Sequence, residues 1–184
     1  MSETKIIKFD YDPQAAREVV LWFLNKHGGK LDILKLVKLI FLADREHLFR
    51  YGRTIVGGFY VAMQHGPVPS NLYDDLKDAK QFPDKHPYDF SGEYQLTAKE
   101  SFDEDEFSES ELEILEMIDS EFGKMDPFKL RDLTHELKAY QKNYPDINQK
   151  TSNPMSYEDF FLDTVDKDML DLILEDVEVK SFFE

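Results

Sequence analysis

Residues 33–50 read Ile33-Leu-Lys35-Leu-Val-Lys38-Leu-Ile-Phe-Leu-Ala-Asp44-Arg-Glu-His47-Leu-Phe-Arg50, and this stretch decides the fold. At about 100° per residue, its apolar side chains cover one side of a helix and spread beyond it. A helix this apolar has to be largely surrounded by the rest of the chain, so we predict that it is central to the core. Asp44 falls among the apolar side chains, where a carboxylate needs hydrogen-bond partners or a shifted pKa.

Signals for helix ends flank this stretch. Asp32 is suited to cap its first turn, and Tyr51-Gly52 ends it. Upstream, Asp12-Pro13 combines an N-cap side chain with a proline at the first helical position, and Gly28-Gly29 stops the helix that follows. Apolar residues spaced three and four apart between these signals predict an amphipathic helix over residues 13–27.

Strand-like sequence follows the central helix. Ile55-Val56 and Phe59–His65 are rich in β-branched and aromatic residues, and Gly57-Gly58 separates them. The turn-forming sequence Gly66-Pro67-Val68-Pro69 ends the second segment. Weaker alternation over residues 88–96 predicts a third strand.

Further helices complete the expected architecture. Capping signals predict helix starts at Pro69 or Ser70, Ser108, Asp126, Ser156 and Asp168, the last running to Glu184. We therefore predict one α+β domain over residues 1–184, mainly helical, with a small inserted antiparallel β element of two to three strands. The motif-bearing region covers about residues 10–165, and an acidic C-terminal helix covers about 166–184.

The chain is acidic, and its acidity is confined to one half. It has 184 residues with 22 basic and 38 acidic side chains, a net charge of −16. Residues 1–100 hold 14 of each kind, whereas residues 101–184 hold 8 basic and 24 acidic side chains. This distribution argues against a nucleic-acid partner, which requires an excess of Lys and Arg. A solubilising surface, a docking site for a basic partner and nucleic-acid mimicry are the readings left open.

Composition also predicts the compartment. The chain has no cysteine, which excludes disulfide frameworks and thiolate chemistry. Its longest apolar run, Val19–Leu24, is far shorter than the roughly 20 residues that cross a bilayer. The first residues have no apolar segment typical of a secretory signal. We expect a soluble, cytoplasmic protein without membrane insertion.

Residues suited to catalysis are scattered. No pair among the histidines has the spacing of a zinc signature; they are His27, His47, His65, His86 and His135. Asp44 and His47 could share a metal ion, but a hydrogen-bonded pair on one helix is favoured. His65 could be a general base, but a histidine at a strand end whose ring is hydrogen-bonded to the backbone is the favoured interpretation. Because phosphate loops and nucleophile elbows are also missing, we expect no catalytic residue, no metal and no cofactor.

Recognition is better supported than catalysis. Lys35, Lys38 and Arg45 fall on one side of the central helix and form a basic face in an acidic protein. Aromatic side chains bracket the Gly-Pro corner: Tyr51, Phe59, Tyr60 and Tyr73. Aromatic residues beside rigid turns are good contact surfaces. A solvated basic face and packing of the aromatic residues against the central helix are the competing interpretations.

Several motifs carry a family resemblance. They are Lys35-Leu-Val-Lys38-Leu-Ile-Phe41-Leu-Ala-Asp44, Tyr51-Gly52-Arg53-Thr-Ile55-Val-Gly57, Tyr60-Val-Ala62, Gly66-Pro67-Val68-Pro69-Ser70, Leu133-Thr-His135-Glu136 and Met155-Ser-Tyr157-Glu158. Together they resemble the Panacea domain of the SocA-like antitoxin family, which is also found in phage-associated proteins. The resemblance extends over about residues 10–165 and implies a largely helical fold with a small sheet.

The resemblance implies an antitoxin that neutralises a cognate toxin, encoded by a neighbouring gene, through direct protein contact. Our candidate toxin-contact residues are Lys35, Lys38, Tyr51, Tyr60, His65, Pro67 and Tyr73. The residues expected to organise the structure are Asp44, Gly52, Gly57, Gly66 and His135. A basic toxin would dock on residues 101–184 with strong salt dependence, whereas binding at the aromatic corner would depend little on salt.

Two alternatives remain open at the level of sequence. The resemblance also admits a proteolytic adaptor that delivers its partner to a ClpXP-type protease. A metal-dependent enzyme or a phage regulatory protein is the other alternative, and its site would have to use His65, His47, Asp44 and His135.

Overall fold

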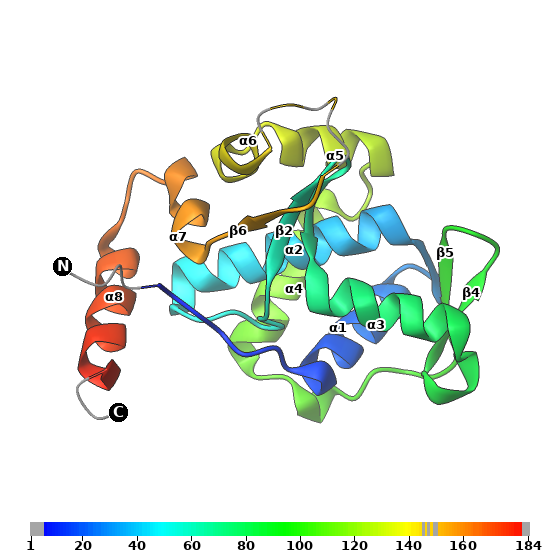
Figure 1. The fold of residues 1–184 in the computed structure, drawn as a ribbon. Helices are drawn as coiled ribbons and strands as arrows, with labels where there is room; N and C mark the ends of the chain where they lie inside the picture. The colour runs from blue at the N-terminus through cyan, green and yellow to red at the C-terminus, as the bar shows by residue number, and fades with distance from the viewer. Residues whose placement is uncertain (1–5, 145, 147, 149–150, 182–184) are drawn as a thin grey trace.

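Helix α2 (Ile33–Tyr51) runs through the centre of the molecule (Figure 1). The computed structural model describes residues 6–144, 146, 148 and 151–181. Every side chain from Leu36 to Asp44 is at most 5% exposed, which confirms that this helix is central to the core. Its ends are those that the sequence predicts: Asp32 accepts hydrogen bonds from the first turn, and Gly52 ends the helix in the left-handed conformation.

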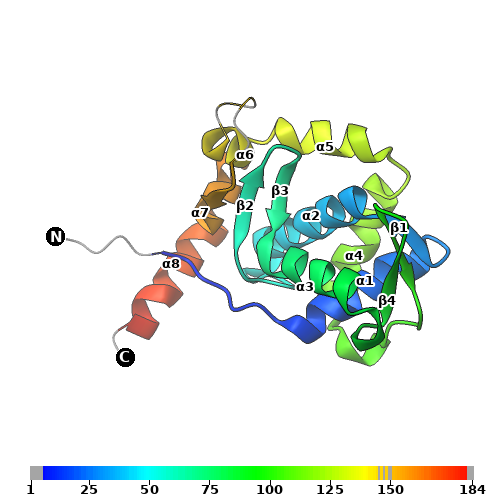
Figure 2. The same ribbon diagram turned by 45° about the vertical axis from the view of Figure 1, so that its right-hand side comes forward.

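The other helices pack around α2 or extend the layer beside it. Those of the described residues are α1 (Pro13–Lys26), α3 (Ser70–Gln81), α4 (Glu109–Phe122), α5 (Pro127–His135), α6 (Lys138–Asn143), α7 (Tyr157–Phe160) and α8 (Asp168–Ser181). Helices α1, α4, α5 and α8 all contact α2. Helix α8 lies at one edge of the molecule, beside the N-terminal segment (Figure 2). The predicted helix starts are confirmed, including the capping box at Ser108; residues 182–184 of the predicted last helix lie outside the described residues.

Two three-stranded antiparallel sheets complete the described structure. One has the order β1 (Lys30–Asp32), β5 (Gln95–Ala98), β4 (Tyr88–Ser91), and the other has the order β3 (Gly66–Pro69), β2 (Tyr60–Met63), β6 (Asn153–Met155). The α+β class and the dominance of helix are confirmed. The β content is larger than the expected single element of two to three strands, because the predicted third strand is a hairpin, β4–β5, that pairs with β1.

The chain that follows α2 corrects two predictions. Ile55 and Val56 form no strand, because their N–H groups donate to a side chain of α2. Gly66–Pro69 does not end the β segment but is itself strand β3, with Val68 opposite Val61. Two prolines are tolerated in this strand because β3 lies at the edge of its sheet, where a missing N–H breaks no ladder.

Asp44 holds the loop between α2 and β2. Its Oδ1 accepts hydrogen bonds from the N–H groups of Ile55 and Val56, each at 2.8 Å. Its Oδ2 accepts from the N–H of Gly57 at 3.0 Å and from the Tyr60 hydroxyl at 2.7 Å. Burial raises the pKa of Asp44, and the four donors oppose that rise because they favour the ionised form. The carboxylate that the sequence places among apolar residues is therefore fully hydrogen-bonded.

Gly57 allows this loop to approach the N-terminal segment. Its φ is +70°, and a Cβ at this position would lie 2.3 Å from the carbonyl oxygen of Asp10. The next residue, Gly58, donates its N–H to the carbonyl oxygen of Phe9 at 3.0 Å. Because a side chain would not fit this space, we propose that Gly57 organises this loop.

Replacing Asp44 should strongly destabilise the fold. Asp44→Leu leaves three N–H groups and one hydroxyl without their acceptor, and each unsatisfied buried group costs about 1–3 kcal/mol. We expect the free energy of unfolding to fall by about 3–5 kcal/mol, measured by urea denaturation. Asp74→Leu, at an exposed position on α3, is the control and should change it by about 0.5 kcal/mol or less. Unchanged or higher stability of Asp44→Leu would contradict the assigned role.

Candidate functional site

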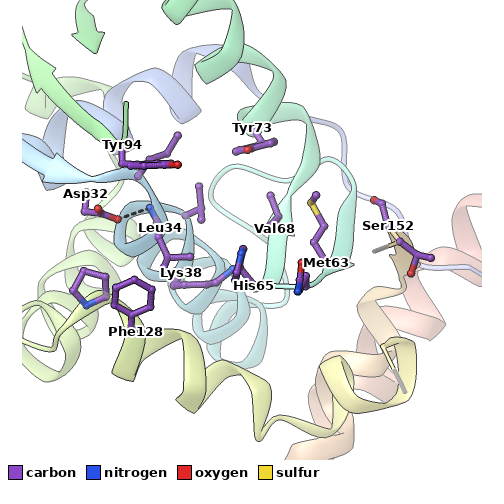
Figure 3. A pocket seen from close by; sticks show the side chains of 15 residues that line it. Asp32, Leu34, Lys38, Met63, His65, Val68, Tyr73, Tyr94, Phe128 and Ser152 are labelled. Carbon is purple, nitrogen blue, oxygen red and sulfur yellow. Dashed lines mark hydrogen bonds between the residues drawn. The ribbon is translucent and has the colours of Figure 1, made fainter. Parts of the chain in front are cut away.

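An open groove of about 770 Å³ lies along the N-terminal half of α2 (Figure 3). Its walls come from α2, the β2–β3 hairpin, α3, the β4–β5 turn, the first turn of α5 and the segment before β6. Most of the lining side chains are apolar: Ile33, Leu34, Val37, Met63, Val68, Tyr73, Tyr94, Pro127 and Phe128. A groove of this size and lining is typical of a binding site.

Lys38 joins α2 to the hairpin beneath the groove. Its side chain is 0% exposed, and its Nζ donates a hydrogen bond to the carbonyl oxygen of Pro67 at 2.7 Å. Burial lowers the pKa of Lys38 to about 7, and the positive charge of Arg131 contributes to the decrease. Lys38 is therefore a buried amine that contacts the hairpin, rather than part of an exposed basic face.

Gly66 makes the contact between Lys38 and α5 possible. Its φ is +98°, and a Cβ at this position would lie 2.9 Å from both Lys38 Cε and Thr134 Oγ1. Three segments that are distant in sequence, α2, β3 and α5, thus meet at one point where there is no room for a side chain. The Lys, Gly-Pro and Thr-His motifs that the sequence singles out converge here.

His135 packs on the far side of this junction. Its ring stacks on Tyr140, with ring centroids 4.5 Å apart and an interplanar angle of 7°. The Tyr140 hydroxyl in turn donates to the carbonyl oxygen of Met63 at 2.8 Å. Burial lowers the pKa of His135, and the nearby charges of Lys38 and Arg131 lower it further. This position supports the organising role expected for His135.

Three of the predicted contact residues meet at the groove. Tyr73 of α3 and Lys38 line it, and His65 lies exposed in the β2–β3 turn at its rim. In Figure 3, the side chains of Lys38 and His65 lie next to each other. Tyr73 and His65 remain candidates for direct toxin contact, whereas Lys38, which is buried, supports the groove from beneath.

The other four predicted contact residues lie elsewhere. Tyr60 and Pro67 are buried, so neither presents a surface to a partner in this structure. The Tyr60 hydroxyl donates to Asp44 inside the core. Lys35 is 9% exposed, so the basic face expected on α2 is wrong. Tyr51 is exposed at the opposite end of α2 from the groove, where its hydroxyl donates to Glu113 at 2.7 Å.

The expected hydrogen-bonded pair of Asp44 and His47 is also wrong. The Nδ1 of His47 lies 2.7 Å from the carbonyl oxygen of Arg53, and its Nε2 lies 3.1 Å from Ser110 Oγ. Asp44 binds a different loop, so the two side chains serve separate contacts. Within the described ranges, three or more His, Asp and Glu side chains nowhere converge in an arrangement that could hold a metal ion.

Several groove residues have no signal in the sequence. Tyr94 and Phe128 are 60% and 59% exposed, although each is a large aromatic side chain. Tyr94 lies in the turn of an unpredicted hairpin, and Phe128 lies in the first turn of α5. They line the same groove because the Tyr94 carbonyl oxygen accepts from the N–H of Ile33 at 2.8 Å, and because α5 packs against α2.

These features define the chain as a small α+β domain with an apolar groove on its surface. A family model described as "Antitoxin SocA-like, Panacea domain" matches residues 36–141, which is more than half of the chain. The chain belongs to this family, whose description supports a role related to toxin–antitoxin systems. Comparisons with curated proteins and with solved structures gave no significant match. In the described part of the chain, no helix is both long enough and apolar enough to cross a membrane.

Lys38 should make the stability of the fold rise with pH between about 7 and 10. The lysine keeps its proton in the unfolded chain up to a pKa of about 10.4, whereas in the folded chain it loses the proton above about 7. The unfolded state therefore binds more protons in this interval, and stability increases with pH.

Chemical denaturation at a series of pH values measures this effect. The free energy of unfolding of the wild type, minus that of Lys38→Met, should increase by up to about 1.4 kcal/mol per pH unit within the interval and level off below it. Subtracting the variant removes the groups that titrate in both proteins. A difference that is constant from pH 7 to 10 would contradict the buried position of Lys38.

Proposed function

We propose that this protein is an antitoxin that neutralises a cognate toxin, encoded by a neighbouring gene, by direct binding in the cytoplasm. One observation carries the proposal: a family-matched domain keeps an apolar groove open to solvent. Tyr94 and Phe128 remain more than half exposed at its rim. Burying large aromatic side chains on binding yields the strongest contributions at protein interfaces.

The dimensions of the groove indicate how a toxin would bind. A volume of about 770 Å³ accommodates a short segment of a partner, such as part of a helix or a loop, rather than a whole domain. A toxin whose segment is held in the groove could not use that segment to reach its own target. The protein then acts by occlusion and needs no chemistry of its own.

Because the groove is lined mostly by apolar side chains, binding there can be distinguished from electrostatic docking by its salt dependence. Of the residues that line the groove, Asp32, Lys38 and His65 are those with ionisable side chains other than tyrosine. Binding dominated by apolar contacts should weaken little as salt increases, whereas docking on the acidic residues 101–184 would weaken strongly. We propose the groove as the principal surface.

Rescue from toxicity tests the proposal in cells. Expression of the neighbouring gene should stop growth, and co-expression of the wild type should restore it. Tyr94→Asp and Phe128→Asp should abolish rescue, because each places a charge where an apolar contact is needed. Leu172→Asp is the matched control: Leu172 is 59% exposed, but it lies on α8, away from the groove, and the variant should still rescue.

Two measurements accompany the growth assay. Circular dichroism of each purified variant should show that the fold is retained, because all three side chains are exposed. The half-life of the toxin should be the same with and without the antitoxin under occlusion; a shorter half-life in its presence would instead favour a proteolytic adaptor. If the wild type fails to rescue, the proposed function is wrong, and if both groove variants rescue, the groove is not the binding surface.

A further inference from the structure

Basic side chains gather at one place beside the groove of this acidic protein. Lys38 of α2 lies beneath the floor, and His65 of the β2–β3 turn lies exposed beside it. Arg131 and His135 of α5 are close enough for their charges to interact with this pair. We call Lys38, His65, Arg131 and His135 the cationic corner.

Little negative charge faces the cationic corner. Asp132 of α5 pairs with Arg131 at 2.6 Å, so these two charges offset each other. Among the described residues that line the groove, Asp32 is the acidic side chain. Its Oδ1 accepts from the N–H of Leu34 at 2.8 Å and caps α2 at the end of the groove near Tyr94 (Figure 3). The described structure places no carboxylate against Lys38, whose Nζ contacts the Pro67 carbonyl oxygen instead.

The corner also has polar nitrogens with unused hydrogen-bonding capacity, and Nε2 of His135 is a donor in one tautomer of the ring. A lysine ammonium has three N–H donors, and the contact with Pro67 uses one of them. The Nε2 of His135 is buried without a hydrogen-bond partner among the described atoms. Unpaired buried polar groups cost free energy, so an acceptor that reaches the corner would be stabilised.

We propose that the cationic corner holds the side-chain carboxylate of an aspartate or glutamate in the toxin segment that occupies the groove. This inference rests on the proposed function and specifies the chemistry of the partner. The segment would carry apolar side chains on both sides of the acidic residue. Those side chains would pack against Tyr94 and Phe128 on one side and against Met63 on the other.

The position of the cationic corner favours binding of a side-chain carboxylate over binding of a C-terminal carboxylate. In Figure 3, Lys38 and His65 lie between Tyr94 and Phe128 on one side and Met63 and Ser152 on the other. A segment that follows the groove therefore continues past the corner in both directions. A C-terminal carboxylate would reach the corner only with half of the groove left empty.

Electrostatics in the groove strengthen such a contact. The low pKa of Lys38, about 7, means that its positive charge is poorly compensated when the groove is empty. A carboxylate nearby would favour the protonated form, so binding would be coupled to proton uptake. The charge would then be paired in a partly enclosed site, where Coulomb attraction exceeds that at an open surface.

Selection from a library of random peptides tests the proposal without knowledge of the toxin. The full-length wild type should enrich peptides with Asp or Glu at one fixed position between apolar residues. His65→Glu places a negative charge at the exposed member of the corner and should enrich Lys or Arg at that position. An acidic peptide selected on the wild type should bind His65→Glu about tenfold or more weakly, measured by calorimetry.

His86→Glu is the matched control. His86 lies just before β4, at the end of that strand that is farther from the β4–β5 turn and the groove. Its ring pairs with Asp78 on α3. This variant should select the same acidic peptides as the wild type. Apolar peptides without an acidic preference, no enriched peptides, or an unchanged preference in His65→Glu would each overturn the proposal.

A second copy of this chain is the competing occupant. Helix α8 carries Asp168, Asp171 and Glu175 near the exposed Leu172, so it has matching chemistry. Sedimentation of the wild type should show a monomer; a dimer that His65→Glu dissociates would assign the groove to a second copy and overturn the proposal. If the wild type selects acidic peptides but fails to rescue cells, the proposed antitoxin function is wrong. The proposed carboxylate-binding role of the corner would then still hold.

Discussion

The carboxylate of Asp44 is the interaction on which the rest of the structure depends. Four donors from one short stretch of chain, residues 55–60, converge on it inside the core. This arrangement sets where β2 begins, and with it the position of the whole β2–β3 hairpin. The hairpin in turn brings the Pro67 carbonyl to Lys38 and forms one wall of the groove.

Two ionisable side chains of opposite sign are thus buried on the same helix, yet neither is the hydrogen-bond partner of the other. Asp44 binds the beginning of the hairpin segment, and Lys38 binds its second strand. Burying such groups has a desolvation cost that packed apolar residues would avoid. What they provide is a defined position for the hairpin, because a shift of one residue would leave both groups without partners. A binding surface built on that hairpin is correspondingly well defined.

The packing of the interior and the chemistry of the groove's rim depend on different residues. Lys38, Gly66 and Thr134 meet where no additional atom fits, so they shape the groove from beneath. Tyr94, Phe128 and His65 lie on turns and a helix start at its edge, where substitution costs the fold little. The net charge of −16, which resides in residues 101–184, therefore describes the surface as a whole and not the groove.

The sequence by itself determined the helices and the class of the fold. Apolar spacing, Asp12-Pro13, the Ser108 capping box and Gly52 act within a few residues of each other, so the helix ends follow from local pattern. It also determined that Asp44 needs partners, because an ionised carboxylate among apolar residues is costly. Tertiary structure decided the rest, because the contacts involved join residues far apart in the chain. The strand nature of Gly66–Pro69 depends on pairing with β2 and on an edge position, and the burial of Lys38 depends on the Pro67 carbonyl. The groove exists because the β4–β5 turn and the first turn of α5, which are distant in sequence, both line it.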